Sequence, residues 1–228
     1  MKTVLSVDVG LKNLGICVMN VTNSRRTVLY WKVLNVFDED SVCQGHLKNG
    51  KECKFKAVNK TDSIVYCKKH TPPNVKVKKI KTRLVKNIPL QEIASRLHAT
   101  FDEFARETRE TLVTVEKVFI ELQPKINNKM KFSSHIIFSK FVEFYREFKT
   151  SVVFESARNK LQVYKGPLIE CNLKTAYSKR KYTGIEHTKK LLAKVENGEV
   201  LLLEFEKNKK KDDLADCFLM CFGKLDRV

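Results

Sequence analysis

The chain has 228 residues, of which 43% are hydrophobic, so it is long enough for one sizeable core and a smaller insertion. Its 44 lysines and arginines against 26 acids give a net charge of +18, which favours a polyanionic partner such as nucleic acid over a membrane surface. No segment approaches the roughly 20 apolar residues of a membrane span, and the first residues lack a signal-peptide pattern. We therefore expect a soluble, intracellular protein whose seven cysteines are reduced or bind metal.

Three strands are predicted at the start of the chain, over residues 2–8, 14–20 and 27–36, because each segment is an apolar run bounded by turn residues. Asp8 ends the first run, two residues before Gly10. A carboxylate at the end of a buried strand is costly unless a cation or a partner compensates it. Asp8 is therefore the first candidate site residue.

Residues 41–75 interrupt this pattern and contain a candidate metal site. The spacing Cys43-x9-Cys53-x13-Cys67-x2-His70 predicts a tetrahedral Cys3His site for one structural Zn²⁺. A segment of about 35 residues with few apolar groups needs such a metal to supply folding energy. Two alternatives stay open, namely His46 as the histidine ligand and a set of unrelated free thiols.

A helix and a fourth strand are predicted next. A basic run over residues 76–86 contains no acid, and Pro89 then opens a helix with apolar residues at helical spacing. The following strand is the apolar run Val118-Phe119-Ile120-Glu121-Leu122. Strand interiors disfavour Glu, so Glu121 is the second candidate site residue.

The second half of the chain is predicted to alternate helices with one strand. Ser133 is the expected N-cap of a helix, residues 151–155 form a fifth strand, residues 158–181 are a basic loop, and residues 184–196 form a helix that ends at Asn197-Gly198. Strands followed by alternating helices and strands imply an α/β core with a mixed sheet.

A last helix should begin near Asp212 and supplies two further carboxylates. Asp213 and Asp216 are i and i+3 residues and share a helix face, whereas Asp212 does not share it and is a weaker candidate ligand. Acids also stabilise helix N-termini, which is the simpler interpretation of each taken alone. An ordered set of four acids on a basic chain instead indicates a shared site for hard cations, and two Mg²⁺ ions about 4 Å apart can clamp a phosphodiester.

These motifs resemble those of the RuvC-type Holliday junction resolvases, most closely the poxviral and mitochondrial branch. The matching segments are Ser6-Val7-Asp8-Val9-Gly10-Leu11-Lys12-Asn13, Ile120-Glu121-Leu122-Gln123 and Lys211-Asp212-Asp213-Leu214-Ala215-Asp216, and the resemblance covers the chain outside roughly residues 41–75. It implies an RNase H-like α/β fold with a five-stranded mixed sheet flanked by helices. It also implies a large DNA virus as the source and action at the site of viral genome replication.

The same resemblance assigns roles to the acids. It implies that Asp8, Glu121, Asp213 and Asp216 are catalytic and hold two Mg²⁺ (or Mn²⁺) ions per active site. It further implies that a homodimer nicks two opposed strands of a four-way junction.

Basic and amide side chains flank the acids in sequence. A carboxylate site repels phosphate, so cationic groups must surround it, and amides hold phosphate or sugar without adding charge. For any single lysine, ordinary solvated charge is the simpler explanation. The predicted DNA-binding residues are Lys12, Asn13, Gln123, Lys125, Asn127, Asn128, Lys129, Lys131, Lys174, Lys179, Arg180 and Lys181.

We therefore divide the chain into an RNase H-like nuclease domain, residues 1–40 and 76–228, and an inserted zinc module, residues 41–75. The predicted activity is Mg²⁺-dependent hydrolysis of phosphodiesters in branched DNA, foremost four-way junctions, by a homodimer that contacts no membrane. Two alternatives stay open. One is an RNA–DNA hybrid nuclease or transposase-like nuclease on the same fold, and the other is a non-catalytic, zinc-containing DNA-binding adaptor.

Overall fold

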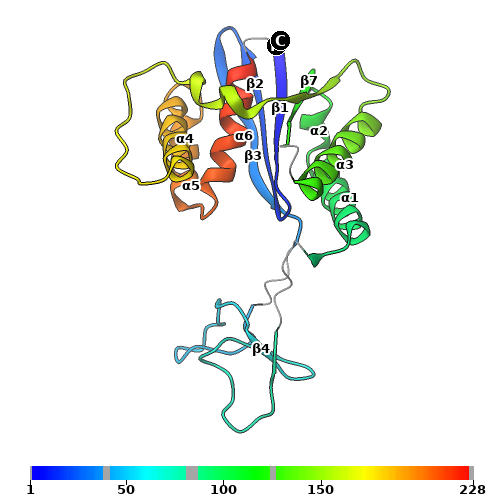
Figure 1. The fold of residues 1–228 in the computed structure, drawn as a ribbon, viewed down its shortest axis with the longest axis vertical. Helices are drawn as coiled ribbons and strands as arrows, with labels where there is room; N and C mark the ends of the chain where they lie inside the picture. The colour runs from blue at the N-terminus through cyan, green and yellow to red at the C-terminus, as the bar shows by residue number, and fades with distance from the viewer. Residues whose placement is uncertain (1, 38–41, 81–86, 124–126, 226–228) are drawn as a thin grey trace. The chain divides into compact units, whose positions relative to one another are not determined.

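The computed structural model describes residues 2–37, 42–80, 87–123 and 127–225 (Figure 1). The chain forms two compact units. The large unit comprises Met1–Val36 with Pro89–Val228, and the small unit comprises Phe37–Ile88.

The large unit contains a five-stranded mixed sheet. Strands β1 (Lys2–Val9), β2 (Asn13–Thr22) and β3 (Arg25–Asn35) form an antiparallel meander, and β7 (Lys117–Glu121) and β8 (Ser151–Glu155) continue the sheet in parallel from the other side of β1. The strand order is β3-β2-β1-β7-β8. This sheet confirms the predicted fold class, and all five predicted strands of the large unit are present.

Helices cover both faces of this sheet. In Figure 1, α1 and α3 lie on one side, and α4, α5 and α6 lie on the other. Within the described residues, none of the helices is both long and apolar enough to cross a lipid bilayer. The helical elements of the large unit are α1 (Leu90–Glu107), α2 (Arg109–Leu112), α3 (Asn128–Phe144), the 3₁₀ helix η2 (Ala157–Val163), α4 (Ala176–Leu192), α5 (Gly198–Lys207) and α6 (Lys211–Lys224).

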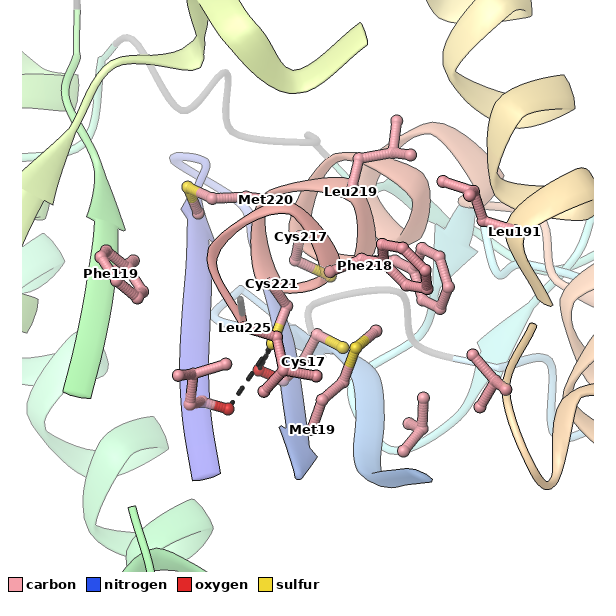
Figure 2. Close-up of a cluster of buried hydrophobic side chains, with 14 of the residues drawn as sticks. Cys17, Met19, Phe119, Leu191, Cys217, Phe218, Leu219, Met220, Cys221 and Leu225 are labelled. Carbon is pink, nitrogen blue, oxygen red and sulfur yellow. Dashed lines mark hydrogen bonds between the residues drawn. The ribbon is translucent and has the colours of Figure 1, made fainter. Parts of the chain in front are cut away.

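Helix α6 forms the centre of the main hydrophobic core (Figure 2). Cys217, Phe218 and Cys221 are fully buried against Cys17 and Met19 of β2. The thiols are therefore packing groups, as expected of buried free cysteine.

Polar side chains of the sheet also bind the carbonyl groups of α6. The Ser6 hydroxyl donates a hydrogen bond to the Cys217 carbonyl oxygen at 2.6 Å, and the Trp31 indole N–H donates one to the Leu214 carbonyl oxygen at 2.9 Å. These directional bonds fix the axial position of the helix, which hydrophobic packing alone leaves free to slide.

Two helix boundaries differ from the sequence predictions. Ser133 does not cap a helix; α3 begins at Asn128, the side chain of Asn127 accepts the Met130 N–H at 3.1 Å, and Ser133 is buried within the helix. Asn127 is an equally good N-cap residue and comes first in the chain, so the helix begins earlier than Ser133 would allow.

The helix predicted over residues 184–196 begins and ends earlier than expected, because its residues belong to α4, which ends at Leu192. Helix α4 begins at Ala176, because the Thr175 hydroxyl caps it by accepting the Ser178 N–H, so part of the predicted basic loop is helical. The predicted stop at Gly198 is instead the start of α5. A Cβ atom at Gly198 would lie 1.8 Å from the Leu192 carbonyl oxygen, so this glycine permits the tight turn of residues 193–197 between the two helices.

The small unit contains a three-stranded sheet and a cluster of cysteines. Strands β4 (Asn59–Lys60), β5 (Val65–Tyr66) and β6 (Lys78–Lys79) are ordered β5-β4-β6. Its buried cluster of described residues consists of Cys43, Cys53 and Cys67. Three two-residue strands around three cysteines do not bury enough apolar area for independent stability, which is consistent with a metal-stabilised fold.

Replacing Gly15 by alanine tests the close contact between α6 and the sheet. The new Cβ would lie 2.7 Å from the backbone oxygen of Asp213, so helix and strand must separate. We expect a loss of about 1–3 kcal/mol from overpacking, seen as a melting temperature lowered by roughly 2–4 °C per kcal/mol.

Gly184→Ala is the matched control, because its Cβ would make only ordinary contacts, at 3.7 Å and 3.8 Å, with Leu161 and Leu219. This substitution within α4 should be neutral or stabilise the chain by roughly 0.5–1 kcal/mol. Equal melting temperatures for the two variants would contradict the close approach at Gly15.

Candidate active site and zinc site

Two candidate carboxylates lie at the ends of neighbouring strands. Val7 on β1 and Ile120 on β7 are partners in the parallel ladder, so Asp8 and Glu121 follow at the same edge of the sheet. Their side chains are only 17% and 16% exposed. Two acids that are far apart in the sequence thus lie at the ends of adjacent strands.

Helix α6 adds the other two acids from above the sheet. Gly15 is the ladder partner of Asp8, and its missing side chain lets the backbone of Asp213 approach. The Asn13 amide at the start of β2 donates a hydrogen bond to the Asp213 carboxylate at 3.1 Å. Asp216 lies on the same helix face, one turn further on.

Lys160 from η2 lies in the middle of these acids and was not identified from the sequence. Its ammonium nitrogen is 3.1 Å from Glu121 Oε1, 3.6 Å from Asp216 Oδ2 and 3.8 Å from Asp8 Oδ1. The side chain is 7% exposed. No periodicity or motif distinguishes this lysine from the other basic residues of the segment 158–181, so only the fold reveals it.

The protonation of these groups is coupled. Burial, and then the hydrogen bond with Glu121, raise the pKa of Asp8 well above its ordinary value of 3.8, although Lys160 opposes the shift. Burial acts in the same direction on Glu121, but the hydrogen bond from Asp8 and the charge of Lys160 outweigh it and lower the pKa of Glu121. Asp8 and Glu121 therefore share a proton more readily than either would hold one alone.

The pKa values of Asp216, Asp213 and Lys160 are also shifted by burial and by neighbouring charges. Burial raises the pKa of Asp216 despite the attraction of Lys160, and burial together with the neighbouring Asp212 raises the pKa of Asp213. Burial by itself would lower the pKa of Lys160, but Asp8, Asp216 and Glu121 outweigh it and raise that pKa. A single ammonium thus faces more negative charge than it neutralises, and the oxygen-only donor set fits hard divalent cations.

Neighbouring acids are neutralised separately. Asp212 accepts a hydrogen bond from the Lys181 ammonium, and this partner lowers the pKa of Asp212 although burial opposes the shift. Glu155 is the ladder partner of Glu121, but its carboxylate binds the Lys224 ammonium at 2.6 Å. Asp212 and Glu155 thus pair with other lysines, whereas Asp8, Glu121 and Asp216 pair with Lys160. This agrees with the helix geometry, which makes Asp212 a weaker candidate ligand.

The predicted DNA-binding residues occupy several environments. Gln123 is buried, and its amide donates to the Val9 carbonyl oxygen at 3.1 Å, so this side chain joins the ends of β7 and β1. Asn127 caps α3 and Lys181 binds Asp212. Lys125 lies outside the described residues. Lys129 and Asn13 are half-buried, and the exposed members are Lys12, Asn128, Lys131, Lys174, Lys179 and Arg180.

The small unit brings together the predicted zinc ligands. One potential donor atom from each of Cys43, Cys53, Cys67 and His70 lies within 4.8 Å of all the others. His70 Nδ1 is 3.4 Å from the Cys43 sulfur and 3.6 Å from the Cys67 sulfur, and the Cys53 and Cys67 sulfurs are 3.9 Å apart. His46 is not a member of this cluster of described residues, and its backbone pairs with Glu52 instead.

Backbone N–H groups support thiolates at this site. The Gly45 N–H donates to the Cys43 sulfur at 3.4 Å. Burial alone would raise the pKa of Cys67, but backbone N–H groups of His70 and Lys69 lower it. Three thiols and an imidazole at these separations are the ligand set that binds zinc in tetrahedral structural sites.

Comparison with known proteins gives no sequence match and clear structural ones. The sequence matches no protein-family model and no curated protein. The fowlpox virus resolvase in complex with its substrate Holliday junction DNA superposes with a TM-score of 0.51 at 14% identity, covering 99% of this chain and 97% of the other. The yeast mitochondrial Holliday junction resolvase gives a TM-score of 0.51 at 14% identity, covering 97% of this chain and 78% of the other.

The chain has the RuvC-type RNase H-like fold. This conclusion rests on the two structural matches together with the sheet order described above, and it confirms the fold that the motifs around Asp8, Glu121 and Asp213 predict.

Asp8→Asn should stabilise the folded chain near neutral pH. The folded-state pKa of Asp8 is raised, so folding favours the protonated carboxyl. The stability that this preference contributes is lost as the pH rises from the ordinary pKa of 3.8 through the folded-state value. Each unit of raised pKa corresponds to about 1.4 kcal/mol. The introduced amide keeps a donor for Glu121 but carries no charge.

The measurement is the melting temperature at pH 7 and pH 4 without added divalent cation. We expect the variant to melt higher than the wild type at pH 7 and the gap to shrink at pH 4. Asp62→Asn, at a fully exposed side chain, is the control and should change little at either pH. An unchanged or lowered melting temperature of Asp8→Asn at pH 7 would contradict the raised pKa of Asp8.

Proposed function

We propose that the protein is a divalent-metal-dependent endonuclease that resolves DNA four-way junctions. The observation that carries this proposal is the convergence of Asp8, Glu121, Asp213 and Asp216 from β1, β7 and α6 at one edge of the sheet. Structural neighbours with the same fold are Holliday junction resolvases, and one of them is bound to junction DNA.

The four acids would hold two Mg²⁺ or Mn²⁺ ions. When bound, such ions activate water and neutralise charge on the attacked phosphate and on the leaving 3′ oxygen. Asp213 is held by Asn13, and Asp8 and Glu121 are fixed on rigid strands, so the donors are positioned before the ligand arrives.

Lys160 supplies the remaining positive charge. Its raised pKa keeps the ammonium protonated at any physiological pH. Because the side chain is buried among the acids, little of it is accessible to a phosphate oxygen. In the absence of cations it also limits the repulsion among Asp8, Glu121 and Asp216.

Substrate binding and assembly follow from the same proposal. The exposed basic residues at the start of β2, α3 and α4 would contact the phosphates of the junction arms, which neutralises part of the repulsion from the acids. Resolution requires two opposed nicks, so we include a homodimer with one active site per subunit. Residues 41–75 form the inserted zinc module, with Cys43, Cys53, Cys67 and His70 as ligands.

Active-site variants test the catalytic assignment. In Mg²⁺, Asp8→Asn and Glu121→Gln should lower the rate of junction nicking by on the order of 10²–10³ or more, because each removes a charged group that acts on the transition state. Binding of the junction, measured without metal, should be kept or tightened, since a repelling charge is removed.

Two controls make the same chemical changes nearby. Asp212→Asn and Glu155→Gln alter acids that Lys181 and Lys224 already neutralise, so both variants should keep most of the activity. Nicking of RNA–DNA hybrid in preference to the junction would favour the hybrid nuclease. Tight junction binding by wild type with no nicking in Mg²⁺ or Mn²⁺ would favour the non-catalytic adaptor.

Metal analysis tests the zinc site. Elemental analysis should give about one zinc per chain, and Cys53→Ser, Cys67→Ser or His70→Ala should lose it and make the small unit sensitive to protease. His46→Ala and Cys171→Ser should keep the metal, because neither residue belongs to the four-residue group. Loss of zinc in His46→Ala with retention in His70→Ala would show that His46, and not His70, is the histidine ligand.

A further inference from the structure

The small unit carries a concentration of positive charge. Residues 42–80 contain ten lysines and two acids, Glu52 and Asp62, a difference of +8, and all ten lysines are exposed. Charge of this density keeps a small unit in self-repulsion unless a polyanion neutralises it. The positions are Lys48, Lys51, Lys54, Lys56, Lys60, Lys68, Lys69, Lys76, Lys78 and Lys79.

An aromatic ring lies exposed among these lysines. Phe55 is 56% exposed, although apolar area of that size is normally buried. Its backbone is fixed on both sides, because the Cys43 N–H donates to the Phe55 carbonyl oxygen at 2.9 Å and the Cys53 sulfur accepts a hydrogen bond from the Phe55 backbone. The cysteine cluster therefore holds an exposed ring on a rigid segment.

Lysines from two segments of the chain lie near this ring in space or in sequence. The Lys69 ammonium lies 5.6 Å from the centre of the Phe55 ring, and Lys69 also donates its backbone N–H to the Cys67 sulfur. Lys54 and Lys56 flank Phe55 in sequence, and Lys68 precedes Lys69. Both segments that form this surface are thus anchored on the cysteines of the proposed zinc site.

We propose that this Phe55 surface, formed by Phe55 with Lys54, Lys56, Lys68 and Lys69, binds nucleic acid, with the ring stacked on an unpaired base and the lysines on adjacent phosphates. Any base offers a π face, so an exposed ring among cations binds single strands without reading sequence. This site would act in addition to the carboxylate site. Its rigidity rests on the proposed zinc site, but its binding does not rest on the proposed nuclease activity.

Binding of full-length, zinc-loaded protein to a fluorescein-labelled oligothymidine tests the proposal, with Mg²⁺ omitted so that nothing is cleaved. Phe55→Ala should raise the Kd about tenfold or more, as loss of one stacked base does, and Phe55→Tyr should restore binding. Val75→Ala, which trims a 47% exposed side chain of the same unit, should leave the Kd unchanged.

A second measurement separates stacking from charge. An oligonucleotide that carries 2-aminopurine should be quenched by the wild type and by Phe55→Tyr but not by Phe55→Ala. Lys68→Ala with Lys69→Ala should lower the salt dependence of binding by about 0.7 for each phosphate that the protein no longer neutralises. The same double change at Lys48 and Lys51 removes equal charge away from the ring in sequence and should have a smaller effect.

Three results would overturn the proposal. These are a zinc-loaded Phe55→Ala with wild-type affinity, an equal effect of Val75→Ala, and Phe55-dependent binding to phosphatidylserine vesicles with unchanged DNA binding. Junction nicking is assayed separately, so a protein that does not nick junctions but binds single strands through Phe55 contradicts the proposed activity alone.

Discussion

The close approach of helix α6 to β1 and β2 is the constraint on which the site depends. Gly15 leaves room for the Asp213 backbone where any other side chain would collide with it. Ser6 and Trp31 then fix the helix along its axis by binding its carbonyl oxygens. With the helix so fixed, Asp213 and Asp216 meet the ends of β1 and β7, and a shift of one turn, about 5.4 Å, would remove both.

This arrangement sets stability against function. Asp8, Glu121 and Asp216 are gathered around one lysine, and burial opposes the charge on each. The cores around them compensate, because Cys217, Phe218 and Cys221 bury fully on the same helix that carries the acids. A helix with one face in the core and its N-terminal turn at the site can therefore hold charges in positions that they would not occupy on their own.

The sequence predicts the parts of the site that have local signals. Asp8 and Glu121 are conspicuous because an acid interrupts an apolar strand, and Asp213 and Asp216 because their spacing places them on one helix face. Lys160 has no such signal, since a lysine in a basic segment is indistinguishable from its neighbours until the fold places it among the acids.

The same distinction between local and long-range information explains the fold. The strand predictions succeeded because an apolar run bounded by turns is a local pattern. The predicted start of α3 was wrong because Asn127 and Ser133 are both good caps, and the cap that comes first in the chain starts the helix. Helix α5 was missed because Gly198 opens a helix where glycine ordinarily ends one.

The two candidate metal sites differ in the metal that their ligands prefer. The acids of the large unit offer only hard oxygen donors, which suit Mg²⁺ or Mn²⁺, whereas the small unit offers three sulfurs and one imidazole, which suit Zn²⁺. Their supporting shells differ in the same sense. The carboxylates are oriented by Asn13 and Lys160, and the sulfurs by backbone N–H groups of Gly45, Lys69 and His70. Backbone donors cannot be removed by side-chain mutation, so the cysteine site can organise a segment that has almost no core, while the carboxylate site depends on a large core to position every donor.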